Sequence, residues 1–392
     1  MTEREFHRAM DLLTPDAEME RRIAAAVKVE RQSKRKRNNW KRVVLAAAAA
    51  ALLVTTAMAA LVPGLSQRLL EYLGVAPEDA QTVELLAPGA MAVDITKEDN
   101  GAALRVTQIL RDRNSVMVLA DFIAPEGTVL NMGDLDAPGS WMRKGFSLTS
   151  ETNACFMDEA GTPMGDGLVS YYGWEVLEDD DPLDNHITAL FVLYPQAGEE
   201  ALQNAATLRV PAADLSYFDS DGFDSEAVYY GDWTVQVPLP QQDIGYAQQA
   251  DQVIGEPSEA GITLEEVYLS PMALELTLTR EGREDLSSGA QENEEVRWRS
   301  LANSADNVTL TSKDGMTAVL ELGGGGRMDA EKQVASFRLS EITDPTKFQG
   351  GTLTLEWDFS PENSGFVTIL LDNLSPVEAY SSTILKANES LR

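Results

Sequence analysis

Few residues beyond the N-terminal region have types and spacing suited to catalysis. His186 is the only histidine after residue 42, with Asp184 two positions before it. A single histidine beside one predicted strand is expected to lie at the surface. The sequence contains no Gly-x-Ser-x-Gly motif, and nothing positions a serine for a triad that uses His186. Carboxylates are abundant, but abundance alone does not indicate a catalytic pair. We therefore predict no enzymatic activity and no catalytic residues.

Three further stretches could hold a metal or a phosphate group. Residues 219–226 (DSDGFDSE) place alternating carboxylates on a turn, yet the glycine and the last acid do not fall where a calcium loop needs them. Gly323–Gly326 has no following Lys-Ser/Thr, so it is interpreted as a turn and not as a phosphate loop. Cys155 is alone and can form neither an intrachain disulfide nor a cysteine zinc site. We predict no metal and no cofactor.

The strongest signal of position is the apolar stretch Val43–Val62 (VVLAAAAAALLVTTAMAALV). Twenty residues of helix measure roughly 30 Å, the thickness of a bilayer core. Residues 1–42 hold 12 Lys and Arg against 7 Asp and Glu, a net charge of +5. Because the whole chain has a net charge of −32, the remaining 350 residues carry −37. Positive charge stays in the cytoplasm, so we predict a single-pass membrane protein with an internal N-terminus and an external C-terminal part. Cleavage after Ala59, in an Ala-x-Ala pattern, remains the alternative, although residues 1–42 are long for a signal peptide.

The negative charge of the predicted external part limits the classes of partner that it can bind. A strongly acidic domain repels nucleic acid, so no nucleic-acid partner is expected. The apolar stretch itself would contact membrane lipid, and an envelope or wall ligand of the external part is conceivable. Inside, residues 1–42 predict two short helices whose apolar side chains recur at helical spacing. These side chains are the candidate partner-binding residues Phe6, Met10, Leu13, Met19 and Ile23.

The external part changes from helical to strand periodicity. Leu65, Leu69 and Leu73 predict a short juxtamembrane helix that ends at Gly74 and that lies on the membrane or packs under the first domain. From about residue 87 apolar residues alternate, as in the hairpin of residues 103–110 and 115–122, whose turn Arg111–Asn114 is polar. Residues 131–187 look irregular and are interpreted as an insert.

The same pattern returns in the second half of the chain. Residues 100–104 (NGAAL) resemble residues 260–264 (AGITL), and residues 231–235 (GDWTV) resemble residues 354–359 (TLEWDF). We therefore predict a mainly β fold with two consecutive immunoglobulin-like β-sandwich domains. The predicted divisions are a cytoplasmic segment 1–42, a transmembrane helix 43–62, a juxtamembrane helix and linker 63–86, a first β domain 87–240 with the insert 131–187, a second β domain 241–376 and a tail 377–392.

This layout resembles a family of single-pass proteins of Gram-positive bacteria. The resemblance rests on the helical N-terminus from Phe6 to Arg42, the Trp-Lys-Arg approach to the span, and short motifs including residues 231–235 and 261–271. Members pair an external domain of unknown function with an immunoglobulin-like domain and are described as anti-sigma-factor-like, working beside an extracytoplasmic-function sigma factor. His7 has no cysteine partner before residue 43, which excludes the zinc-containing type of anti-sigma domain.

The expected function is therefore that of a membrane signalling protein, an anti-sigma-factor-like regulator. Its external domains would sense an envelope condition, and residues 1–42 would bind a cytoplasmic regulator, which we expect to be a sigma factor. The alternative is a membrane-anchored surface binding or scaffold protein whose N-terminus serves only as an anchor.

Overall fold

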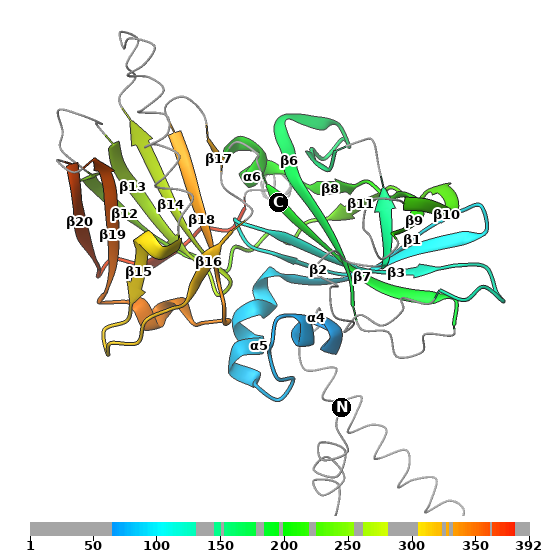
Figure 1. Cartoon of the computed structure of the whole chain (residues 1–392), viewed down its shortest axis with the longest axis horizontal. Coiled ribbons are helices and arrows are strands. Elements are labelled where there is room, and N and C mark those ends of the chain that lie inside the picture. The colour runs from blue at the N-terminus through cyan, green and yellow to red at the C-terminus, as the bar shows by residue number, and fades with distance from the viewer. Residues whose placement is uncertain are drawn as a thin grey trace, which may run out of the picture. The chain divides into compact units, whose positions relative to one another are not determined.

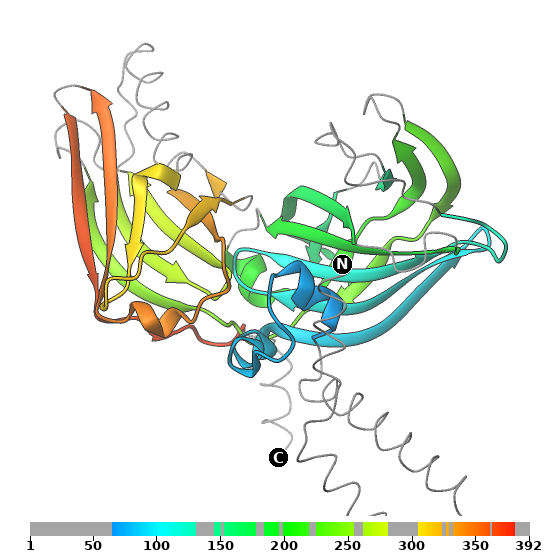
Figure 2. The same ribbon diagram turned by 60° about the horizontal axis from the view of Figure 1, so that its bottom comes forward.

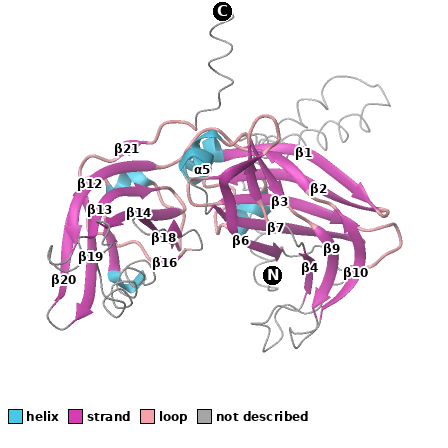
Figure 3. Cartoon of the chain, turned by 90° about the horizontal axis from the view of Figure 1, so that it is seen from above, coloured by secondary structure: helices cyan, strands magenta, loops and turns pink. Residues whose placement is uncertain are grey.

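The computed structural model describes residues 65–130, 145–149, 153–177, 184–195, 199–218, 225–254, 262–280, 305–323, 327–328, 332–360 and 363–380. The chain divides into two compact units, residues 1–61 and 62–392. Among the described residues strands greatly outnumber helices, as Figures 1 and 3 show. The expectation of a mainly β protein is confirmed.

Two short helices precede the first strand. Helix α4 (Gln67–Tyr72) begins where the Ser66 hydroxyl accepts the N–H of Leu69, and it is followed by Gly74 at a φ of +69°. A short helix is thus confirmed here, with Leu69 and Leu70 buried against the β structure, while its place beside a membrane stays a prediction. A second helix, α5 (Ala80–Leu86), was not predicted; Asp79 caps it, and the 3-10 turn η1 (Ala87–Gly89) follows.

The first β region contains two antiparallel sheets within the described residues. The larger sheet has the strand order β1-β2-β3-β7-β6-β5-β8-β11, and the smaller has the order β10-β9-β4. Their bounds, with helix α6, are β1 (Ala90–Asp99), β2 (Ala102–Arg111), β3 (Val116–Ile123), β4 (Gly145–Thr149), β5 (Cys155–Met157), β6 (Pro163–Val176), β7 (His186–Pro195), α6 (Glu199–Asn204), β8 (Thr207–Val210), β9 (Ala213–Phe218), β10 (Ser225–Asp232) and β11 (Val235–Pro238).

Both sheets of this region contribute to one hydrophobic core. Trp233 is fully buried in it, donates its indole N–H to the carbonyl of Ala102 (3.3 Å), and meets Phe122 edge to face at 4.9 Å. Leu148 from β4 and Leu215 from β9 reach the same core. Burial of such apolar area on both inner faces is what holds the two layers together.

The second β region repeats this layering with different strands. A sheet ordered β16-β18-β14-β13-β12-β21, with β17 paired to β18, shares a core with the sheet β15-β19-β20. Figure 2 shows β19 and β20 as a long hairpin. The bounds, with two 3-10 turns, are β12 (Tyr246–Ile254), β13 (Ile262–Leu269), β14 (Ala273–Arg280), η2 (Ala305–Asn307), β15 (Val308–Thr311), β16 (Leu320–Leu322), β17 (Arg327–Met328), β18 (Lys332–Leu339), η3 (Pro345–Phe348), β19 (Gly351–Ser360), β20 (Asn363–Leu371) and β21 (Ser375–Pro376).

The expectation of irregular structure over residues 131–187 is wrong for the part that is described. Strands β4, β5 and β6 all fall in that range, and β6 pairs with β7 inside the larger sheet. Three glycines and one aspartate in β6 suggested turns, but cross-strand pairing stabilises a strand despite such residues. The described strands of this range therefore belong to the sheets of the first β region.

The internal repeat is real for one sheet in each region. Strands β1-β2-β3-β7 and β12-β13-β14-β18 have the same order and pairing. The bulge of the β2–β3 pair between Val106 and Gln108 matches that of the β13–β14 pair between Leu264 and Glu266. Val106 therefore corresponds to Leu264, so the sequence match of Leu104 with Leu264 was two residues out of register.

The second sequence match does not correspond to a structural one. Trp233 lies between β10 and β11, whereas Trp357 is inside β19 and is only partly buried. The two tryptophans belong to different places in the layered sheets. Their local sequences resemble each other without sharing a position.

No described helix is long and apolar enough to cross a bilayer. The predicted transmembrane helix, residues 43–62, lies outside the described residues, as do the cytoplasmic segment 1–42 and most of the tail 377–392.

Candidate functional site

Two equivalent hairpin turns meet where the two β regions join. In the β2–β3 turn, the Asp112 N–H donates to the Ser115 carbonyl (3.0 Å). The Asp112 carboxylate folds back over its own turn, where Oδ1 accepts the backbone N–H groups of Asn114 (2.9 Å) and Ser115 (2.7 Å). This is an Asx-type turn, in which the side chain replaces a backbone acceptor. It explains why a polar sequence forms a tight connection here.

The β13–β14 turn uses the same pattern with a neutral side chain. Ser270 N–H donates to the Ala273 carbonyl (2.8 Å), and Ser270 Oγ accepts the N–H groups of Met272 (3.1 Å) and Ala273 (2.9 Å). The two turns contact each other directly, because Ser270 Oγ donates to Asp112 Oδ2 (2.6 Å). Both side chains are fully buried. Each turn therefore supplies a hydrogen-bond partner to the other.

Burial of Asp112 has an electrostatic consequence. Removing a carboxylate from water disfavours its charged form. Burial raises the pKa of Asp112 to about 7, and the nearby negative charges of Asp243 and Glu275 act in the same direction, while hydrogen bonds from Ser270 and Ser115 oppose it. Asp112 thus exchanges a proton near neutral pH.

Arg113 extends from the first turn to two acids of the second region. Its Nε contacts Glu275 Oε2 at 2.8 Å, and its Nη2 contacts Glu266 Oε1 at 2.5 Å. The guanidinium also lies over the ring of Tyr268, 4.5 Å from the centroid. Burial lowers the pKa of Arg113, but the charges of Glu275 and Glu266 outweigh it and raise the pKa overall. Glu275 is fully buried, so this pair is largely shielded from solvent.

Tyr268 connects the second sheet to the linker between the regions. Its hydroxyl donates to Asp243 Oδ1 (2.7 Å), which also accepts the N–H of Gly245 (2.7 Å). Burial raises the pKa of Tyr268 well above its ordinary value. Gly245 lies so close to the ring that an added Cβ would come within 2.2 Å of it. A glycine is required here by the close approach of backbone and ring.

Arg111 is a fully buried cation at the junction. It donates to the carbonyl oxygens of Pro240 (3.2 Å) and Leu202, and its guanidinium lies 3.7 Å from the ring centroid of Tyr380. Phe156 covers it at 5.6 Å. Burial lowers the pKa of Arg111. Tyr380 thus brings the segment after β21 back from the second β region onto the first.

The helices α4 and α5 share a third hydrophobic cluster with both regions. It joins α4 and α5 to the outer face of the larger sheet and to residues of the second half, and its buried members are Leu69, Leu70, Val75, Val83, Leu86, Leu110, Met117, Leu119, Leu190, Val192, Ile244 and Met272. Met272 belongs to the β13–β14 turn itself. The residues nearest to the predicted span are therefore packed against the junction.

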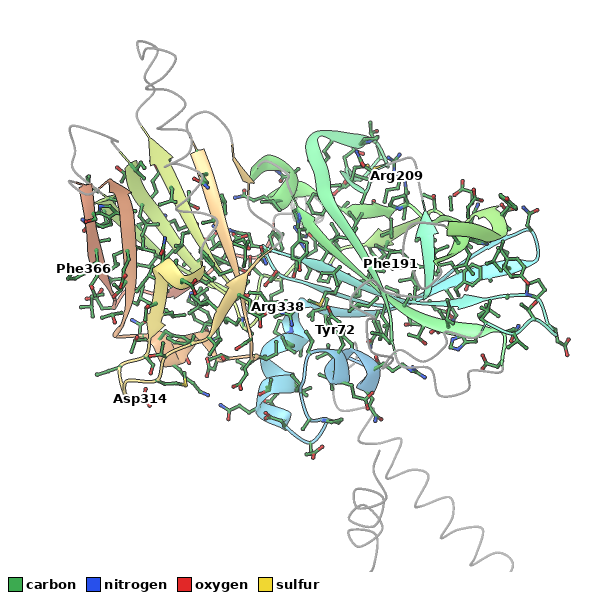
Figure 4. The ribbon with its side chains drawn as sticks, in the orientation of Figure 1. Tyr72, Phe191, Arg209, Asp314, Arg338 and Phe366 are labelled. Carbon is green, nitrogen blue, oxygen red and sulfur yellow. The ribbon has the colours of Figure 1, made fainter. Side chains whose placement is uncertain are left out.

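A small hollow lies beside this cluster. It measures about 40 Å³ and is lined by Tyr72 from α4, Asn114 from the β2–β3 turn, and Arg338 at the end of β18, among others. Figure 4 labels Tyr72 and Arg338. The hydroxyl of Ser336 on β18 donates to Asn114 Oδ1. The hollow is much smaller than a typical ligand pocket.

The residues singled out in the sequence have different positions. Phe6, Met10, Leu13, Met19 and Ile23 lie outside the described residues, and so does most of 219–226. His186 is partly buried and not freely exposed, because its Nε2 lies 3.2 Å from Asp121 Oδ1, and this hydrogen bond raises the pKa of His186. Gly323 pairs with Ser336 through a backbone bond of 2.9 Å. Cys155 is buried in β5.

The described residues contain no group of three or more His, Cys, Asp or Glu side chains able to hold a metal ion. Sequence reasoning identified Arg111–Asn114 as a polar hairpin turn and assigned it no partners. The signal that it missed is in the repeat. The corresponding residues after β13 are Ser270-Pro271-Met272, none of which is charged, and Glu266 and Glu275 supply charges opposite to Arg113.

Comparisons with known proteins add little. Neither a protein-family model nor a curated protein sequence matches the chain. A solved structure described as "the conserved domain protein from Bacillus anthracis" is similar over 74% of this chain and 92% of its own, with 12% identity and a TM-score of 0.36.

Proposed function

We propose that this chain is a single-pass membrane signalling protein, an anti-sigma-factor-like regulator of the Gram-positive family that its sequence resembles. In this proposal residues 43–62 span the membrane and residues 1–42 bind an extracytoplasmic-function sigma factor. The two layered β regions would be immunoglobulin-like sandwiches outside the cell that sense an envelope condition. The protein would have no catalytic role.

One observation carries the proposal. Helix α4 begins five residues after the predicted span, and its Leu69 and Leu70 are buried in a cluster that also includes Ile244 and Met272. A change at the junction of the β regions therefore alters the surroundings of the segment that leads to the membrane. An element whose packing differs between two states is the physical requirement for passing a signal between sites.

The charge distribution supports the same orientation. Residues 28–42 before the span hold eight Lys and Arg, whereas residues 63–92 after it hold one, Arg68, which agrees with the positive-inside rule. The apolar residues Phe6, Met10 and Leu13 recur at the spacing with which an amphipathic helix fills a groove. A segment of 42 residues is too short to bury a large core alone, so it would fold best on binding its partner.

The test is capture of the partner by residues 1–42 at native expression levels. A sigma factor should bind the wild-type segment and should be lost when Phe6, Met10 and Leu13 are changed to Ser together. A matched control replaces the polar Arg4, Arg8 and Asp11 with Gln, which leaves the apolar side chains intact. Recovery of no regulator, together with unchanged transcription after residues 1–30 are replaced by neutral sequence, would favour the surface-anchored binding protein instead.

A further inference from the structure

We propose that two copies of this chain associate through β20, which pairs with β20 of the second copy in an antiparallel arrangement about a two-fold axis at Thr368. Strand β20 is the last strand of the sheet β15-β19-β20, and Figure 1 shows it at the end of that sheet. Within the described part of the chain, the strand that pairs with it is β19. The N–H and C=O groups along an unpaired edge are a template for a further strand.

The other edge strands of the described sheets are protected against such pairing, and β20 is not. Edge strands are usually short, or they carry charges, proline or bulges that stop a further strand from docking. Strand β1 carries four charged residues and a bulge, β10 has two register shifts, and β11 ends in Pro238. Strands β4, β15, β16, β17 and β21 have no more than five residues each. By contrast, β20 has nine residues with no charge and no proline.

The backbone of β20 faces the free edge at every second residue. The Leu371 carbonyl accepts the N–H of Gly350, next to β19 (2.6 Å), whereas the Leu370 carbonyl accepts the side chain of Gln248 on the other side (2.8 Å). Peptide groups alternate in direction along a strand, so the even-numbered residues of β20 direct their N–H and C=O groups away from β19. A carbonyl oxygen can accept two hydrogen bonds, so the Gln248 contact leaves Leu370 able to pair.

The same even-numbered residues expose their side chains. Phe366 is 71% exposed and Leu370 is 53% exposed. Between them lies the exposed Thr368, whose hydroxyl is hydrogen-bonded to that of Thr354 on β19 (3.0 Å). A strand that docks at this edge would therefore gain backbone hydrogen bonds and cover two large apolar side chains.

The sequence of β20 favours a second copy as the docked strand. Residues 366–370 (FVTIL) have nearly the same shape in both directions, with a β-branched residue on each side of a central threonine and a large apolar residue at each end. Antiparallel pairing about Thr368 places Phe366 opposite Leu370 of the second copy, and the two central threonines opposite each other. This register makes about six backbone hydrogen bonds. The surface is therefore self-complementary, as a two-fold interface must be.

The charge distribution permits this pairing although the chain is acidic. The net charge of −32 makes two copies repel each other on the whole. Residues 363–371 carry no charge, and Asp372 falls opposite Ser364 of the second copy and not opposite another acid. One strand pair covers less than the roughly 800 Å² per partner of a standard interface, so we expect a reversible dimer that dissociates on dilution. Salt should strengthen the dimer by screening the repulsion.

This inference goes beyond the proposed signalling role and does not depend on it. The test is sedimentation equilibrium of the full-length chain in detergent micelles, at protein concentrations from about 1 to about 200 μM, the range of a weak dimer. Thr368→Lys places two like charges opposite each other at the axis, and it should raise the dissociation constant of the dimer at least about tenfold.

Thr354→Lys is the matched control for this change. It adds the same charge to the same face one strand away and removes the same hydrogen bond between the two threonines. The dissociation constant should therefore stay nearly equal to that of the wild type. A wild-type chain that is monomeric over the whole range, or equal constants for the two lysine variants, would overturn the proposal. Equal constants would also result if another segment of the chain formed the dimer.

Chemical cross-linking tests the register independently. Cys155 is the only cysteine, so Cys155→Ala gives a background without thiols. In that background Thr368→Cys should cross-link with a short bis-maleimide reagent, because facing residues of an antiparallel pair lie about 5.5 Å apart. Thr354→Cys should not, since three strand spacings, about 14 Å, separate its two copies. A yield several-fold higher for Thr368→Cys supports the two-fold axis, and equal yields contradict it.

Discussion

The two β regions build the same four-stranded frame and differ in the turn between its second and third strands. The turn of the first region carries Arg111, Asp112 and Arg113, whereas the turn of the second carries Ser270 and no ionisable side chain among residues 270–273. The second region instead places Glu266 and Glu275 on its strands, where they bind Arg113. The two copies of the frame thus carry opposite charges that pair with each other, and not the same side chains at the same places. The difference is what lets the two copies bind each other.

The largest expected effect comes from removing the cation that joins the copies. Arg113→Ala leaves the fully buried Glu275 without its arginine, and breaking a buried pair in this way costs about 3–5 kcal/mol. The matched control is Arg105→Ala in the same sheet, whose pair with Asp94 is exposed and should contribute at most about 1 kcal/mol. Denaturant unfolding of the full-length chain measures both. Equal losses in the free energy of unfolding would show that the buried pair of Arg113 contributes no more to stability than the exposed pair of Arg105.

A second prediction separates the two tryptophans that the sequence pairs with each other. Trp233→Ala should cost about 3–5 kcal/mol, because it empties a fully buried position beside Phe122. Trp357→Ala should cost less, since Trp357 is only partly buried. Thermal unfolding of the two variants side by side tests the difference. A larger loss for Trp357 would contradict the positions assigned to the two residues.

The glycines just before β1 and β12 provide a third comparison. Gly89→Ala would bring a Cβ within 2.5 Å of the Arg111 carbonyl, and Gly245→Ala would bring one within 2.2 Å of Tyr268. Each change overpacks its junction and should cost about 1–3 kcal/mol. Gly165→Ala, in β6 with nothing within 4 Å, is the control and should leave unfolding nearly unchanged. Loss in only one of the two junction variants would show that the repeats differ there.

The smallest effect is expected at Phe366 on β20 (Figure 4). Its side chain is 71% exposed, so Phe366→Ser should change the free energy of unfolding by no more than about 0.5 kcal/mol. Phe337→Ser, in the core of the same region, should be strongly destabilising and serves as the contrast. Urea unfolding of both variants measures this. A marked loss in Phe366→Ser would mean that the outer face of β20 is packed against something.

Sequence periodicity was sufficient for the central hairpins because apolar residues alternate over most of β2, β13 and β14. It missed β12, whose sequence YAQQADQVI is mostly polar and whose Asp251 has a positive φ of 46° within a bulge. Alternation identifies strands with one buried face, and it fails where a strand is held mainly by its neighbours.

The junction could not be predicted for a different reason. A turn rich in arginine and aspartate is ordinarily solvated, and only the second region makes it buried. No local property of residues 111–115 distinguishes the two outcomes. The partners of this turn lie far away in the chain, at Leu202, 91 residues on, and at Pro240, Glu266 and Glu275, more than 120 residues on. Long-range pairing of this kind is visible only when both copies are compared in space.

The return of Tyr380 onto Arg111 has a consequence for the order of events during synthesis. The β2–β3 turn is made first, but the groups that neutralise it appear only after residues 266–275, and the ring that covers Arg111 follows the last strand. We expect the charged turn of the first region to remain in contact with water until nearly all of residues 65–380 have been synthesised. The junction can then form only after both β regions have been synthesised.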